Sequence, residues 1–101
     1  MKQIETGLEE GDLIKIVELI KKNNQILEVI LFGSRAKGSF HEGSDVDLAI
    51  KGNNITLNDI LDLANDLDNL NLPYKFDLVC YDKIKEKELI DHINRVGITL
   101  F

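Results

Sequence analysis

The chain has little of what secreted and membrane proteins need. Its 101 residues include one cysteine, Cys80, so no disulfide can form within the chain. No apolar run approaches the roughly 20 residues that a membrane-spanning helix requires, and the first residues lack the pattern of a secretory signal. These absences predict a cytoplasmic protein that does not enter a membrane.

Basic residues are outnumbered by acidic ones. Lys and Arg together number 12, against 18 Asp and Glu, which gives a formal net charge of −6. A surface of this sign repels the phosphate backbone that a nucleic-acid-binding protein has to approach. We therefore expect no binding to duplex nucleic acid.

The chain does contain enough apolar material for a folded core. Hydrophobic residues make up 44% of the sequence and charged residues 30%, without repeats or low-complexity segments. A chain of this length has room for a single core. We predict one domain that spans residues 1–101.

Two capping boxes predict where helices begin. Thr6 with Glu9 precedes apolar residues at helical spacing, which predicts a first helix that ends near residues 21–24. Thr56 with Asp59 predicts a second long helix from Leu57 onward. The apolar stripe expected on that helix consists of Leu57, Ile60, Leu61, Ala64 and Leu67.

Three short apolar segments are typical of strands, and they alternate with the helices. Asp82 is placed to cap a last helix that Gly97 ends, and the tail at residues 98–101 can extend a sheet edge or pack beneath it. The polar residues 33–44 suit a turn and a short helix. The predicted order is α-β-α-β-α-β-α, which indicates the α/β class. The predicted strands cover residues 25–32, 45–50 and 74–81.

The most informative segment is GSRAKGSFHEGSDVD, from Gly33 to Asp47. Residues two apart in an extended strand project to the same side, so Asp45 and Asp47 present two carboxylates to one point. Such a pair is usually tolerated because a cation lies between the charges, and oxygen ligands favour Mg²⁺ or Mn²⁺. The alternative is that both acids are solvent-facing residues of a half-exposed strand.

The turn before these acids has features of a phosphate site. A strand that ends at Gly33 and Ser34 and leads into a short helix presents backbone N–H groups to a phosphate. Arg35 and Lys37 add two cations that can meet the phosphates of a metal-bound nucleotide. Each cation taken alone is as readily explained by solubility. Neither a P-loop nor an EF-hand fits this segment.

The spacing of Gly33-Ser34, ten residues and then Asp45-Val46-Asp47 resembles the G-S-x10-D-x-D signature of the DNA polymerase β-type nucleotidyltransferase superfamily. The chain is most similar to its minimal nucleotidyltransferases, which are commonly paired with HEPN-domain partners in toxin–antitoxin modules. The resemblance covers nearly the whole chain and implies a small mixed β-sheet flanked by helices. It also implies a third carboxylate on the next strand, where Asp77 stands.

This resemblance implies a metal-dependent enzyme that uses ATP or another nucleoside triphosphate. Two ions of Mg²⁺ or Mn²⁺ would assist in-line transfer of a nucleoside monophosphate with release of pyrophosphate. The implied catalytic and metal-binding residues are Asp45, Asp47 and Asp77. The implied nucleotide-binding residues are Gly33 and Ser34, supported by Arg35 or Lys37.

The resemblance also implies a partner. The acceptor would be a hydroxyl, expected on a tyrosine of a HEPN-domain protein, so that transfer of AMP makes this protein an antitoxin. The alternative is a non-catalytic module that neutralises the partner by complex formation alone. A core of this length has little material left to enclose a base or an acceptor, so something else must complete the site. A homo-oligomer is compatible with that need.

The remaining candidates have weaker patterns. His41 in the glycine-flanked loop and His92 on the last helix are expected at the surface, and Cys80 in the core. The helix from Leu57 carries four acids without a basic residue, which predicts a solvated face or a docking site for a basic partner. These acids are Asp59, Asp62, Asp66 and Asp68.

Overall fold

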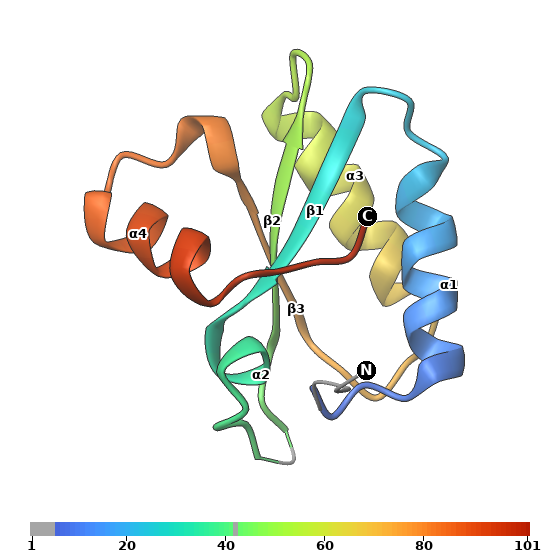
Figure 1. Ribbon diagram of the computed structural model, residues 1–101. Helices are drawn as coiled ribbons and strands as arrows, with labels where there is room; N and C mark the ends of the chain where they lie inside the picture. The colour runs from blue at the N-terminus through green and yellow to red at the C-terminus, as the bar shows by residue number, and fades with distance from the viewer. Residues whose placement is uncertain (1–5, 42) are drawn as a thin grey trace.

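A computed structural model describes residues 6–41 and 43–101 and forms a four-stranded sheet with helices on both faces (Figure 1). The strand order is β3-β2-β1-β4; β1 is antiparallel to β2 and β4, and β2 is parallel to β3. This mixed sheet and the alternation of helices and strands confirm the predicted α/β fold. The elements are α1 (Glu10–Lys21), β1 (Ile26–Phe32), α2 (Gly33–Lys37), β2 (Val46–Gly52), α3 (Leu57–Asp68), β3 (Phe76–Cys80), the 3₁₀ helix η1 (Tyr81–Lys83), α4 (Lys87–Val96) and β4 (Ile98–Thr99).

The sheet separates two apolar cores. Figure 1 shows α1 and α3 on one side of the sheet and α4 on the other. Since side chains alternate along a strand, β1 and β2 contribute to both cores, which explains their nearly continuous apolar sequences. The α4 side holds Ile30, Phe32, Ala49 and Ile93. The larger core on the α1 and α3 side includes Ile16, Ile20, Val29, Leu31, Val46, Leu48, Ile50, Leu63 and Leu67.

The two predicted capping boxes have different outcomes. At α3, the hydroxyl of Thr56 accepts a hydrogen bond from the N–H of Asp59 (3.2 Å), and the carboxylate of Asp59 accepts one from the N–H of Thr56 (2.8 Å), which confirms the prediction. At α1 the prediction is wrong, because Glu9 is the N-cap and makes no side-chain cap. Gly7 between the two residues has a positive φ of 76°, so this segment cannot start a helix.

The last helix also begins later than predicted. Asp82 lies in η1, and the chain stays extended at Ile84 before α4 begins. The physical reason is packing, because Ile84 contributes its side chain to the α4-side core. Gly97 ends α4 as expected, and the tail extends the sheet as β4, with Leu31 opposite Ile98.

The buried stripe of α3 differs from the predicted one. Leu63 and Leu67 are buried, whereas Leu57 and Leu61 are 68% and 57% exposed. A helix turns about 100° per residue, so a buried face centred between Leu63 and Leu67 directs Leu57 and Leu61 away from the core. Around the helix, the sequence places leucines on both flanks of Ile60, and only packing decides which of these leucines are buried. Among the described residues, every helix is too short or too polar to cross a bilayer.

Candidate functional site

Three carboxylates come together where β2 and β3 begin. The two strands run parallel with Asp47 opposite Asp77, and Asp45 directly precedes β2. Val46 and Leu48 point into the α1 and α3 core, so the alternation along the strand places Asp45 and Asp47 on the α4 side. Asp77 lies on that side as well, since its neighbours in β3 pack against the α1 and α3 core. Thus the three predicted acids share one face of the sheet.

The central carboxylate of this cluster has a perturbed acidity. The pKa of Asp47 is raised from 3.8 to about 6, first by burial and then by the negative charges of Asp77 and Asp45. Asp45 and Asp77 themselves are exposed. A bound cation would relieve this repulsion.

The donor set fits a magnesium or manganese ion. All three groups are carboxylates, and hard oxygen ligands suit these ions better than zinc. Within residues 6–41 and 43–101, no three His, Cys, Asp or Glu side chains are grouped so that they could hold a metal ion. A metal bound at these acids would therefore need further ligands, which Mg²⁺ commonly takes from water and from substrate phosphates.

The turn at Gly33 lies directly against this cluster. Phe32 is the last β1 residue and pairs with Asp47, and the next residue, Gly33, has a φ of +76°. A Cβ atom on Gly33 would overlap Oδ2 of Asp47. Glycine is therefore required here for its backbone conformation and for its lack of a side chain. Figure 1 shows α2, which starts with this turn, at one end of the sheet.

Arg35 holds segments of the fold together. It is 4% exposed; its Nε and Nη2 donate to the carbonyl of Ser44 (3.2 and 2.9 Å), and its Nη1 donates to the carbonyl of Thr6 (2.9 Å). Its guanidinium also lies over the rings of Phe40 and Tyr74. These contacts hold the guanidinium in the protein interior, so Arg35 is not available to bind a phosphate.

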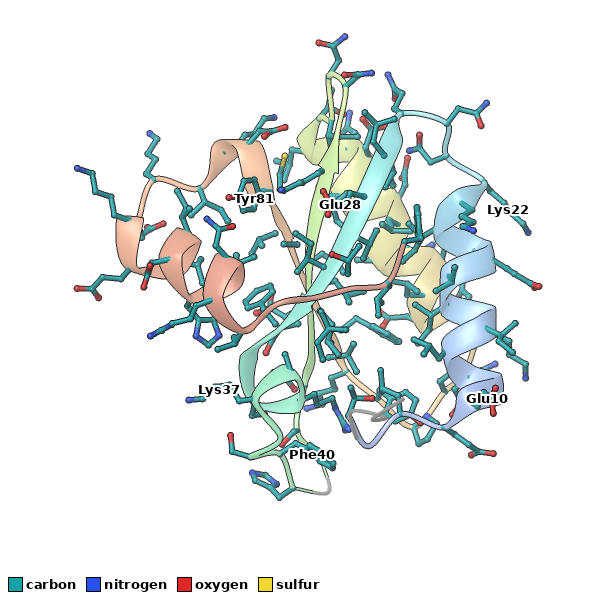
Figure 2. All side chains as sticks on the ribbon, in the orientation of Figure 1. Glu10, Lys22, Glu28, Lys37, Phe40 and Tyr81 are labelled. Atoms are coloured by element: carbon teal, nitrogen blue, oxygen red, sulfur yellow. The ribbon has the colours of Figure 1, made fainter. Side chains whose placement is uncertain are left out.

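Ser34 and Lys37 lie on the same short helix as Arg35. Ser34 is half-buried and follows Gly33 in the first turn of α2. Lys37 is exposed, and Figure 2 shows its side chain extending away from the body of the molecule. Of the two cations suggested by the sequence, Lys37 is therefore the one that remains accessible to a phosphate.

His92 joins the site although its position on the last helix suggested a surface residue. Its Nε2 accepts a hydrogen bond from the N–H of Gly33 (3.1 Å). Its ring is half-buried and packs edge-on against Phe32, with the ring centroids 6.1 Å apart. The spacing of His92 from the apolar residues Leu89 and Ile93 is a signal in the sequence, because all three lie on one face of a helix.

The sequence also singled out His41 and Cys80. His41 is exposed in the loop between α2 and β2, where its N–H donates to Oγ of Ser44 (2.9 Å). Cys80 is half-buried, ends β3 and packs toward the α1 and α3 core, as expected. The side chain of Cys80 therefore lies on the face of the sheet opposite the three acids.

The acids of α3 border a groove on the other side of the sheet. This groove lies between α1 and α3 and has a volume of about 240 Å³. The pKa of Asp59 is lowered by its hydrogen bonds to Thr56, which agrees with its capping role. Asp68 does not line the groove. The lining residues are Leu19, Lys22, Asn23, Asp59, Asp62, Leu63 and Asp66.

Solved structures share this architecture. A mutant of the toxin–antitoxin complex MntA–HpeT superposes with a TM-score of 0.74 and 27% identity, over 93% of this chain and 72% of that chain. A toxin–antitoxin complex crystallised with AMP-PNP has a TM-score of 0.73 and 25% identity, over 93% and 73% of the two chains. The tri-AMPylated HEPN toxin of Shewanella oneidensis in complex with its MNT antitoxin gives 0.72 and 20%, over 93% and 72%.

The sequence also matches a family model. The model described as Polymerase beta, Nucleotidyltransferase aligns with residues 14–101, which contain the turn at Gly33 and the three acids. No curated protein matches the sequence significantly. Because the family model covers most of the chain, this protein belongs to the polymerase β-type nucleotidyltransferase family, as its resemblance implied.

Proposed function

We propose that this protein transfers a nucleoside monophosphate, from ATP, to an acceptor hydroxyl. The observation that carries the proposal is the convergence of Asp45, Asp47 and Asp77 beside the turn at Gly33. Membership of the nucleotidyltransferase family supports it, and a solved relative at 25% identity was crystallised with AMP-PNP, an analogue of ATP. The bond formed joins the acceptor oxygen to the α-phosphorus, and the bond broken releases pyrophosphate.

The carboxylates would hold two ions of Mg²⁺ or Mn²⁺. Asp45 and Asp47 are proposed as ligands of both ions, and Asp77 as a ligand of the catalytic ion that also accepts the proton of the acceptor hydroxyl. Bound metal supplies charge neutralisation for the triphosphate and activates the attacking oxygen. Gly33 and Ser34 would bind and orient the terminal phosphates, with Lys37 as the accessible cation.

The acceptor is proposed to be a hydroxyl of a HEPN-domain protein, so that this chain acts as an antitoxin. Solved relatives at 25% and 27% identity are toxin–antitoxin complexes. In a relative of the same fold, the HEPN toxin bound to the MNT antitoxin is tri-AMPylated. Asp45 and Asp77 are exposed, which supports an acceptor as large as a protein side chain on a folded partner.

A non-catalytic antitoxin is the second candidate. One observation favours it, since no three His, Cys, Asp or Glu side chains in the part of the chain that the structure describes are grouped so that they could hold a metal ion. In this case the protein would neutralise its partner by forming a complex. A pure binder has no need of three convergent carboxylates, which is why we rank it second.

Labelled ATP separates the two candidates. The protein would be incubated with Mg²⁺, the protein encoded by the neighbouring gene, and ATP labelled at the α- or the γ-phosphate. We expect label on the partner from α-labelled ATP only, and none with Asp45→Asn/Asp47→Asn. The matched control Asp62→Asn/Asp66→Asn makes the same charge change in the distant groove and should transfer label normally.

Each other outcome has a clear meaning. Equal transfer by the wild type and Asp45→Asn/Asp47→Asn would show that the proposed metal site is wrong. If no variant transfers label but every variant neutralises the toxicity of the partner, the protein is a non-catalytic antitoxin.

A further inference from the structure

His92 makes a direct contact with the turn of the candidate site. It lies on α4, 59 residues from Gly33 in the sequence, and its Nε2 accepts the N–H of Gly33 at 3.1 Å. Acceptance by Nε2 requires the ring proton to be on Nδ1. The packing of the ring against Phe32 supports this orientation of the imidazole.

The contact between His92 and Gly33 lies just beyond the last residue pair of β1 and β2. That pair is Phe32 with Asp47, so the N–H of Gly33 lies beyond the strand pairing. A half-buried backbone N–H needs a partner, and His92 supplies it. Since Gly33 also touches the carboxylate of Asp47, a shift of its peptide would move the phosphate turn relative to the metal-binding acids.

The packing of α4 does not depend on this hydrogen bond. Ile93 is 1% exposed in the α4-side core, and Leu89 packs against the same core. A second hydrogen bond, from the hydroxyl of Tyr81 to Oδ1 of Asn94 (2.9 Å), joins α4 to η1. Residues other than His92 therefore hold α4 in place.

We propose that His92 is a positioning residue of the nucleotidyl-transfer site, which holds the peptide of Gly33 and thereby the Gly33–Ser34 turn in place over Asp47. The inference rests on the proposed function and names a residue outside its three acids and its phosphate turn. His92 acts through Gly33 and touches no reacting atom. Because in-line transfer requires accurate alignment, and a displacement of about 1 Å can cost about 100-fold in rate, the loss of this restraint should slow the reaction.

Three variants separate positioning from general stability. His92→Leu removes the acceptor but keeps an apolar side chain against Phe32, and His92→Gln offers an acceptor oxygen at a similar reach. Asn94→Leu is the matched control, because it deletes a hydrogen bond from the same helix that does not involve Gly33.

The first measurement is amide hydrogen exchange of the free protein by NMR. We expect the Gly33 amide to exchange at least about tenfold faster in His92→Leu, and to be protected again in His92→Gln. Asn94→Leu should leave this amide unchanged. The nitrogen shifts of the wild-type ring should report a proton on Nδ1. Unchanged exchange in His92→Leu would overturn the proposal, because Nε2 would then not be the partner of Gly33.

The second measurement is steady-state transfer of AMP from Mg·ATP to the HEPN-domain partner. His92→Leu should lower kcat by about 10- to 100-fold with less than about threefold change in KM, and His92→Gln should recover to within about threefold of the wild type. Asn94→Leu should retain wild-type kcat. If His92→Leu does not fold, His92→Asn takes its place, since its side chain is too short to reach Gly33, and it should be slow where His92→Gln is active.

The two hypotheses fail in different ways. If the wild type transfers AMP and His92→Leu does so at the same rate, only the role of His92 is overturned. If the wild type transfers no AMP, the proposed function is overturned and the catalytic role of His92 with it, whatever the exchange of Gly33 shows.

Discussion

At the scale of single residues, Gly33 and Asp47 depend on each other. The turn comes so close to the carboxylate that no side chain fits on Gly33, and its φ of +76° disfavours every other residue. The same proximity helps to bury Asp47, and burial is the largest cause of its raised pKa. A substitution at either residue should therefore affect the other.

Gly33→Ala should harm both stability and metal binding. The left-handed conformation costs an alanine about 1 to 2 kcal/mol, and the new Cβ would also displace the Asp47 carboxylate. Gly38→Ala is the matched control, since Gly38 has a similar φ of +82° but open space where its Cβ would lie. Urea denaturation and Mg²⁺ titration would be measured for both. Equal losses in the two variants would show that the contact with Asp47 is unimportant.

The acidity of Asp47 predicts how stability depends on pH without metal. Its pKa is about 6 in the folded protein and near 3.8 unfolded, so the folded state binds the proton more tightly. The free energy of unfolding that depends on Asp47 is therefore highest below pH 4 and falls as the pH rises to about 6. Asp47→Asn removes that loss and should be more stable than the wild type at pH 7, by about 1 kcal/mol after allowance for solvent screening.

The check is urea denaturation in EDTA from pH 4 to pH 8. Other groups titrate in this range as well, so the quantity to compare is the difference between Asp47→Asn and the wild type. A difference that stays constant with pH would contradict the assignment.

At the scale of elements, the same local signal predicted a helix start correctly at Thr56 and wrongly at Thr6. The capping box at Thr56 joins residues three apart, and both of its backbone hydrogen bonds form within the first turn of α3. The stops at Gly33 and Gly97 were also predicted correctly. Thr6 failed as a cap because Gly7 bends the chain, and because the carbonyl of Thr6 is held by Arg35.

Two alanine substitutions compare these helix starts. Thr56→Ala should lower the free energy of unfolding by about 1 kcal/mol, since it removes the acceptor for the N–H of Asp59. Thr6→Ala should cost less than about 0.5 kcal/mol, because Thr6 caps no helix and its backbone contact with Arg35 remains. Chemical denaturation of both variants measures the difference. A larger loss in Thr6→Ala would contradict the observed start of α1.

At the scale of the whole molecule, the sheet separates two acidic regions. The carboxylates of the candidate site lie on the α4 side, and the acidic groove lies between α1 and α3. The acidic residues that give the chain its net charge of −6 therefore do not form one continuous patch. The pKa of Asp47 in the first region is raised by burial and by its acidic neighbours, whereas the pKa of Asp59 in the groove is lowered by its hydrogen bonds to Thr56.

Addition and removal of Mg²⁺ should distinguish the two regions. Binding to the folded state stabilises it by about 1.4 kcal/mol at a concentration ten times Kd, so Tm should rise with Mg²⁺ and fall again with EDTA. Asp45→Asn/Asp47→Asn should abolish this response, and Asp62→Asn/Asp66→Asn should retain it. A response that survives in the first variant and disappears in the second would place the ion in the groove. Thermal denaturation followed by circular dichroism is sufficient.

The sequence by itself determined the order of helices and strands and the pairing of Asp45 with Asp47 on one side of a strand. Apolar periodicity, glycine stops and the two-residue repeat of a strand are all properties of neighbouring residues. For the same reason, the spacing from Gly33 to Asp47 was enough to indicate the family.

Only the tertiary structure decided which side chains complete the site. The register of β2 with β3 sets Asp77 opposite Asp47, the carbonyls of Thr6 and Ser44 draw Arg35 into the interior, and α4 brings His92 to Gly33. Except for the contact of Arg35 with Ser44, these contacts join residues at least 29 positions apart in the sequence. Such residues come into contact only when the whole core packs, and no local pattern in the sequence encodes that packing.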